Sequence, residues 1–97
     1  MTALSDTQIN EALDELPGWS FEDDHMVRTF TFRSFKEALS FIVRVGMHAE
    51  EAGHHPEIFN VYATVRIALN THDVGGKVTQ RDVDLARTIS GFDWTRD

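Results

Sequence analysis

The sequence contains no cysteine among its 97 residues. Disulfides, thiolate nucleophiles and cysteine-based zinc sites are therefore excluded, and the absence fits a reducing cytosol. Basic residues are also scarce, since 9 lysines and arginines face 16 aspartates and glutamates, giving a formal net charge of −7. Because this charge repels a phosphate backbone, we expect no direct binding to nucleic acid.

Long apolar runs are missing as well. No stretch approaches the roughly 20 apolar residues of a membrane span, and residues 1–10 lack the basic start and apolar stretch of a signal peptide. We therefore expect a cytoplasmic protein that contacts no membrane. The short chain has no repeat or linker, which predicts a single domain over residues 1–97. The core of such a domain is modest, so oligomerisation would help to stabilise it.

Capping and alternation signals divide the chain into helices and strands. Three Ser or Thr residues, each followed three positions later by Gln, Glu or Asp, predict helix starts: Ser5 with Gln8, Ser34 with Glu37, and Thr79 with Asp82. Alternation predicts strands over 19–22, 25–33 and 58–71, the last broken near Ala63 and Thr64 because an unbroken strand would exceed about 40 Å. This order predicts an α+β fold, a four-stranded antiparallel sheet with three helices packed on one face.

The predicted second helix is apolar around most of its circumference. Ala38, Ile42 and Val45 belong to its main stripe, and Phe41 and Val43 extend that stripe further round. A helix this apolar is typically buried on more than one face. In so small a domain, the pattern indicates a subunit interface.

Histidines mark the positions where chemistry is expected. His54 and His55 follow a predicted helix end and precede Pro56, which favours extended backbone, so their side chains should diverge. Glu50, four residues before His54, can orient an imidazole ring. His72 lies at the end of the second strand region, a common position for functional residues.

The spacing of these histidines leaves three interpretations open. They can be acid–base groups, ligands for zinc or iron, or ordinary surface and capping residues. The spacing matches no standard metal motif. His25 and His48 are interpreted as ordinary residues, and Trp19 and Trp94 as packing residues.

A set of motifs in register resembles the pterin-4a-carbinolamine dehydratases. The matching segments cover nearly the whole chain: residues 18–20, 30–32, 35–38, 49–57 (AEEAGHHPE), 59–62 (FNVY), 71–73 (THD), 76 and 82–86. The resemblance implies the α+β fold predicted above, with dimers formed through the sheet and tetramers formed through helices. It also implies dehydration of 4a-hydroxytetrahydrobiopterin to quinonoid dihydrobiopterin, without a metal or cofactor. This recycling step takes place after the reaction of an aromatic amino-acid hydroxylase. The resemblance therefore implies such a hydroxylase as a partner in the same pathway.

The resemblance also implies roles for individual residues. His55 and His72 become proton donors to the 4a-hydroxyl group, and His54 becomes the acid–base group at the pterin ring. The substrate-binding residues that it implies are Glu50, Pro56, Thr71, Asp73 and Val74. The alternative function is a binding, assembly or dimerisation-cofactor role on the same fold. Degenerate relatives with such roles tend to lose the histidines, and their presence here favours the enzyme.

Overall fold

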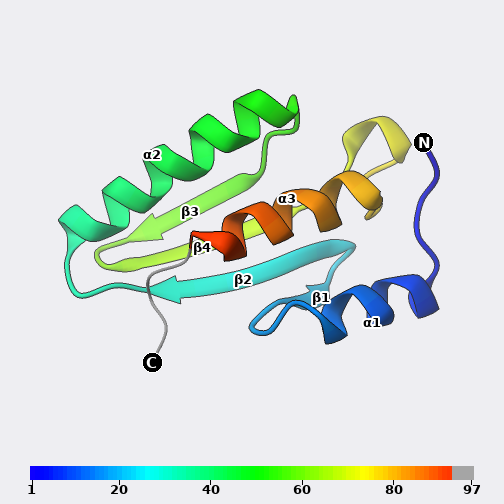
Figure 1. The fold of residues 1–97 in the computed structure, drawn as a ribbon, viewed down its shortest axis with the longest axis horizontal. Helices are drawn as coiled ribbons and strands as arrows, with labels where there is room; N and C mark the ends of the chain where they lie inside the picture. Colours follow the sequence, from blue (N-terminus) through cyan, green and yellow to red (C-terminus); the bar gives the residue numbers. More distant parts are fainter. Residues whose placement is uncertain (93–97) are drawn as a thin grey trace.

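A computed structural model describes residues 1–92, and its elements follow the predicted order (Figure 1). Three α-helices and four strands are joined by short turns, with one 3-10 helix before the last α-helix. The elements are α1 (Asp6–Asp14), β1 (Ser20–Glu22), β2 (His25–Thr31), α2 (Phe35–Ala52), β3 (Glu57–Val61), β4 (Thr64–Leu69), η1 (His72–Val74) and α3 (Gln80–Gly91). The predicted packing role of Trp94 lies outside the described residues.

The predicted capping residues begin all three α-helices. Complete capping boxes, with both reciprocal hydrogen bonds, start α1 and α3. At α2, the Ser34 hydroxyl accepts a hydrogen bond from the backbone N–H of Glu37 (3.1 Å). The carboxylate of Glu37 accepts from the backbone N–H of Arg33 (2.9 Å), one residue before the cap. The box predicted at Ser34 is therefore wrong in its second half, because Glu37 reaches one residue further back.

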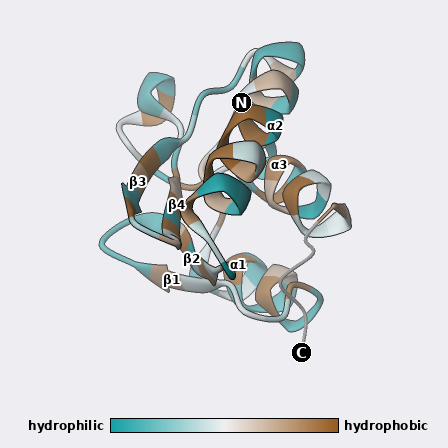
Figure 2. Ribbon diagram, turned by 90° about the vertical axis from the view of Figure 1, so that its left-hand side faces the viewer, coloured by the Kyte–Doolittle hydropathy of each residue, from teal (hydrophilic) through white to brown (hydrophobic). Residues whose placement is uncertain are grey.

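The four strands form one antiparallel sheet in the order β1-β2-β4-β3. The predicted break in the long strand region is confirmed as a two-residue turn at Tyr62 and Ala63. Asn60 holds this turn, since its side-chain amide donates to the carbonyls of Tyr62 (3.0 Å) and Thr64 (2.9 Å). Figure 2 shows the helices on one side of the sheet, which confirms the predicted α+β arrangement.

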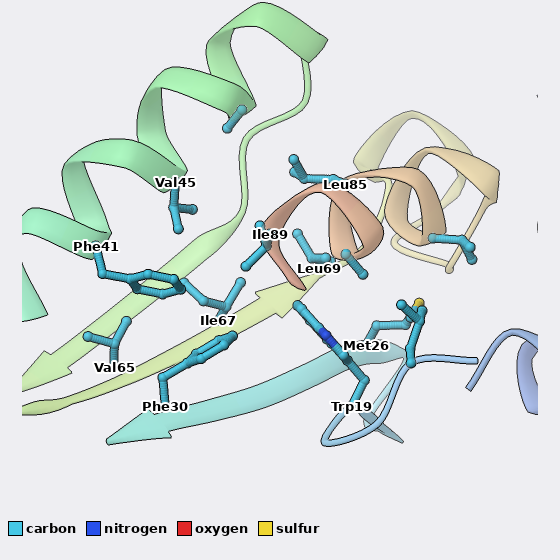
Figure 3. Close-up of a cluster of buried hydrophobic side chains, with 14 of the residues drawn as sticks. Trp19, Met26, Phe30, Phe41, Val45, Val65, Ile67, Leu69, Leu85 and Ile89 are labelled. Atoms are coloured by element: carbon cyan, nitrogen blue, oxygen red, sulfur yellow. The ribbon is translucent and has the colours of Figure 1, made fainter. Parts of the chain in front are cut away.

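The core lies between this face of the sheet and the helices (Figure 3). Met26 and Phe30 alternate along β2 and are almost completely buried. The ring of Phe30 packs against Phe41 of α2, with centroids 4.6 Å apart. Trp19 is also buried, and its indole N–H donates to the hydroxyl of Ser90 (2.9 Å), so its predicted packing role is confirmed.

The sheet face away from the helices carries two ion pairs. His25 at the start of β2 contacts Glu57 of β3 at 2.9 Å, and Arg66 of β4 contacts Glu22 of β1 at 3.1 Å. Each pair joins strands that are not neighbours in the sheet. Each contact therefore spans the strand that lies between its two partners.

His25 is expected to make folding stability depend on pH. Partial burial disfavours its charged form, but hydrogen bonds to the Asp23 carbonyl and the Glu57 carboxylate outweigh that burial, so the pKa of His25 lies above its ordinary value of 6.5. The folded protein therefore holds this proton more tightly than the unfolded chain does. The stabilisation is fully present below pH 6.5 and is lost as pH rises through the folded-state pKa.

Urea unfolding from about pH 5 to pH 9 checks this prediction. Relative to His25→Gln, the wild type should lose free energy of unfolding as the pH rises. Parallel pH profiles for the two proteins would contradict the role of His25.

Helix α2 buries only one of its faces within a single chain. Its buried side is formed by Ala38, Phe41, Val45 and Ala49. A stripe of exposed apolar side chains at four-residue spacing, here called the α2 stripe, runs along the other side: Phe35, Leu39, Val43 and Met47. The second buried face predicted for this helix is therefore not formed within one chain.

Of the helices between residues 1 and 92, none combines the length and apolarity needed to cross a bilayer.

Candidate active site

The ends of three elements meet around one pocket. The C-terminal end of α2, the segment after β4 and the first turn of α3 enclose about 290 Å³. The three histidines singled out from the sequence are all on its wall. The lining residues are Gly53, His54, His55, Asn70, Thr71, His72, Asp73 and Arg81.

The end of α2 separates the two adjacent histidines. Gly53 adopts left-handed backbone (φ 63°) as the helix cap, and the N–H of His54 then donates to the carbonyl of Ala49 (3.0 Å). This closure turns the chain away from the helix axis before Pro56. His54 is only 8% exposed, whereas His55 lies on the surface, so the predicted divergence of the two side chains is observed.

A tight loop positions the third histidine. The N–H of Thr71 donates to the carbonyl of Lys77 (2.9 Å), and the N–H of Gly76 donates to the carbonyl of Thr71 (3.1 Å). The side-chain amide of Asn70 donates to the carbonyl of Gly76 (3.0 Å). These bonds close a loop that carries His72 at the pocket and leaves its ring exposed to solvent.

A buried carboxylate lies beneath the pocket. Asp82 is 0% exposed, and its Oδ1 lies 2.5 Å from Nε2 of His54. Its Oδ2 accepts from the hydroxyl of Thr71 (2.9 Å) and from the backbone N–H of Thr79 (2.8 Å). Since the Thr71 hydroxyl donates to Asp82, it accepts from the Thr79 hydroxyl at 2.7 Å. Within residues 1–92, no buried side-chain nitrogen or oxygen lacks a partner.

This network determines which nitrogen of His54 is available for chemistry. An ionised Asp82 accepts hydrogen bonds only, so the proton of a neutral His54 ring lies on Nε2, between the two side chains. The lone pair of the ring then lies on Nδ1. A histidine oriented in this way by a buried carboxylate is arranged to accept a proton.

The other two histidines have different surroundings. Nε2 of His55 lies 2.8 Å from Oε1 of Glu50, and both side chains are exposed. The contact places the Glu50 carboxylate beside the ring of His55 rather than that of His54. In the described part of the chain, the ring of His72 has no hydrogen-bonding side chain as a partner and faces solvent. Both rings can exchange protons with water.

Comparison with known proteins decides the family. A sequence model of the family described as pterin 4 alpha carbinolamine dehydratase matches residues 2–92. The chain belongs to this family. Family relatives in Opitutus terrae and Nitrobacter winogradskyi share the name "Putative pterin-4-alpha-carbinolamine dehydratase". The first is 48% identical over 96% of both chains, and the second is 52% identical over 92% of this chain and 89% of its own.

Two solved structures resemble this member of the pterin 4 alpha carbinolamine dehydratase family. A transcriptional coactivator/pterin dehydratase from Brucella melitensis has a TM-score of 0.88 and 36% identity, covering 93% of this chain and 97% of its own. A pterin dehydratase-like protein described as a RuBisCO assembly factor of the α-carboxysome has a TM-score of 0.64 and 18% identity, covering 80% and 89%. This second likeness shows the shared fold alone.

The predicted substrate-binding residues are distributed unevenly around the pocket of this family member. Thr71 and Asp73 are on its wall, and Glu50 contacts His55 outside it. Pro56 and Val74 are not among the lining residues.

Sequence reasoning did not single out Asn70 and Arg81, which are on the pocket wall. It noted Asp82 as a helix-capping residue and a family match, but did not place it against His54. Nothing in the sequence distinguishes Arg81 from an ordinary arginine in the first turn of a helix.

The metal interpretation of the histidines gains no support from the geometry. Residues 1–92 contain no group of three or more His, Cys, Asp or Glu side chains arranged to hold a metal ion. His54 and His55 point apart, toward Asp82 and Glu50 respectively.

Proposed function

We propose that the pocket binds 4a-hydroxytetrahydrobiopterin and catalyses its dehydration to quinonoid dihydrobiopterin. The observation that carries the proposal is the convergence of three histidines on one pocket, one of them bonded to a buried carboxylate. Membership of the pterin 4 alpha carbinolamine dehydratase family supports the choice of substrate class.

The reaction moves only protons and one leaving group. The bond from C4a to the hydroxyl oxygen breaks, and the hydroxyl leaves as water after receiving a proton from an acid. The neighbouring N5 gives its proton to a base, and the electron pair forms the double bond between C4a and N5. One acid and one base therefore complete the chemistry, and the proposal requires no metal or cofactor.

The surroundings of the three histidines suggest how these tasks are divided. His54, with Nδ1 as the acceptor, is assigned as the base at N5, and the carboxylate of Asp82 stabilises the imidazolium that forms. His55 and His72 are assigned as proton donors to the hydroxyl group, because both are exposed and can recover a proton from water. Glu50 fixes the ring orientation of His55.

The proposed substrate forms in reactions of aromatic amino-acid hydroxylases. The protein would therefore act after such a hydroxylase in cytoplasmic tetrahydrobiopterin recycling. The cysteine-free composition supports the proposed location, since a reducing compartment needs no disulfides.

Assays with freshly generated 4a-hydroxytetrahydropterin test the function. We expect the wild type to accelerate its decay, and His55→Ala and His72→Ala each to lower turnover at least ~10²-fold if proton donation limits the rate. The matched control is His25→Ala, which removes a histidine from the sheet face away from the helices. A wild-type rate equal to spontaneous decay would reject the enzyme, and full activity in both variants would reject their assigned roles.

The protein is also proposed to form a homodimer or homotetramer. The α2 stripe supports this proposal, since an exposed apolar face on a long helix is typical of an interface. We expect Val43→Glu to reduce the molar mass measured by light scattering. Asn10→Glu, which adds the same charge to exposed α1, should leave the mass unchanged. A monomeric wild type would contradict the proposal.

A further inference from the structure

Thr71 lies on the wall of the pocket, yet only 2% of its surface is exposed. The loop that follows engages its backbone completely. The N–H of Thr71 donates to the carbonyl of Lys77 (2.9 Å), and its carbonyl accepts from the N–H groups of Val74 (3.1 Å) and Gly76 (3.1 Å). A carbonyl oxygen has two lone pairs, so these two bonds use both of them.

The side chain of Thr71 is committed in the same way. A threonine hydroxyl has one proton, and in Thr71 this proton is directed at Oδ2 of Asp82 (2.9 Å). Both donor groups of Thr71, its N–H and its O–H, therefore bond to other parts of the protein. Neither is left to donate to a ligand in the pocket.

We propose that Thr71 is a positioning residue that acts through Asp82 on His54, in place of the substrate-binding role that the resemblance implies. The inference rests on the proposed dehydratase function. It goes beyond that function by adding a chain of buried hydroxyl groups to the residues on which the reaction depends. The chain continues to Thr79, which is completely buried.

The hydrogen bonds of this chain all run in one direction. Because Thr71 donates to a carboxylate, the Thr79 hydroxyl is the donor in the bond between the two threonines (2.7 Å). The oxygen of Thr79 in turn accepts from the backbone N–H of Arg81 (3.3 Å), in the first turn of α3. Hydrogen bonds aligned in this way polarise one another, so each hydroxyl strengthens the bond that the next one donates.

The end of the chain fixes the direction of the Asp82 carboxylate. Oδ2 accepts from the Thr71 hydroxyl and from the backbone N–H of Thr79 (2.8 Å), while Oδ1 faces Nε2 of His54. Turning the carboxylate about its Cβ–Cγ bond would break both bonds to Oδ2. Oδ1 is therefore held against His54, which keeps the ring proton on Nε2 and leaves Nδ1 to accept a proton.

Removal of the Thr71 hydroxyl would leave one donor on Oδ2 and allow the carboxylate to turn. The ring of His54 would then lose its fixed tautomer and orientation, which slows proton transfer without removing a contact to the substrate. A hydrogen bond to a charged group corresponds to a rate change of about ten- to a hundredfold. The loss is therefore expected in kcat rather than in KM.

The test compares Thr71→Val, which removes the hydroxyl and keeps a branched side chain, with Thr71→Ser, which keeps the hydroxyl. We expect Thr71→Val to lower kcat by about ten- to a hundredfold and to leave KM within about twofold of the wild type. Thr71→Ser should retain most of the activity. A raised KM with unchanged kcat in Thr71→Val would show that the hydroxyl binds substrate and would overturn the proposal. Thr29→Val, which removes an exposed hydroxyl from β2, is the matched control.

Nitrogen-15 NMR of the His54 ring tests the same relationship without substrate. At a pH where the ring is neutral, the wild type and Thr71→Ser should carry the proton on Nε2, whereas Thr71→Val should show both ring nitrogens partly protonated. An unchanged spectrum in Thr71→Val would overturn the action of Thr71 on His54. A wild type that fails to accelerate dehydration would instead overturn the proposed function alone. Thermal unfolding verifies that Thr71→Val folds, and Thr71→Ala, with the same expected results, replaces it if it does not.

Discussion

Asp82→Asn is expected to lower kcat by about 10²- to 10⁴-fold. The carboxylate of Asp82 is fully buried and meets Nε2 of His54 at 2.5 Å, although the two residues are 28 positions apart. An amide of the same shape carries no charge to stabilise the imidazolium. Its NH₂ group can also turn toward His54, which would move the ring proton to Nδ1 and block proton acceptance there.

A positioning role for Asp82 is distinguished from a structural one by a double variant. His54→Ala with Asp82→Asn should be about as slow as His54→Ala alone, because Asp82 acts through His54. Losses that multiply would contradict that relationship. Thermal unfolding of each variant measures the separate contribution of the bonds from Asp82 to Thr71 and Thr79. Asp24→Asn, which removes an exposed carboxylate paired with Lys77, is the control for activity.

Phe41→Ala is expected to lower the free energy of unfolding by about 3–5 kcal/mol. The ring of Phe41 is 0% exposed, and its centroid lies 4.6 Å from that of Phe30 and 4.9 Å from that of Phe32. Its removal leaves a cavity between α2 and the sheet. Since small domains are stable by only about 5–15 kcal/mol, much of the stability of this protein depends on that one side chain.

Urea unfolding at concentrations where the chain is monomeric measures this loss. Phe35→Ala removes the same ring from the first residue of the same helix, where it is 53% exposed, and should cost less than about 1 kcal/mol. Equal losses for the two variants would contradict the packing argument. Phe41→Leu, which leaves a smaller cavity, should fall between them.

Local sequence signals predicted most of the fold because they concern neighbouring residues. Capping by Ser5 and Thr79, and alternation along β2, depend on contacts within a few positions. The exception at Glu37 is also local, since its carboxylate accepts from the backbone N–H of Arg33, four residues before it. The strand order β1-β2-β4-β3 depends on contacts between distant segments and did not follow from periodicity.

The site was predictable to the extent that it depends on Pro56 and on the resemblance. Pro56 indicated that His54 and His55 diverge, and their burial agrees. The pairing of His54 with Asp82 depends on the packing of α3 beside the end of α2, which no spacing rule contains. Arg81 had no distinguishing signal, because an arginine in the first turn of a helix usually contacts only solvent.

The place of Asp82 in the first turn of α3 links catalysis to the order in which the protein loses structure. Helix ends open more readily than helix centres. Opening this turn would withdraw the carboxylate from His54 and release Thr71 in one event. Heat inactivation would then begin with partial opening at this turn, below the temperature at which the sheet melts. Amide hydrogen exchange at the start of α3, rather than in β2 or β4, would report how much of the protein is competent for catalysis.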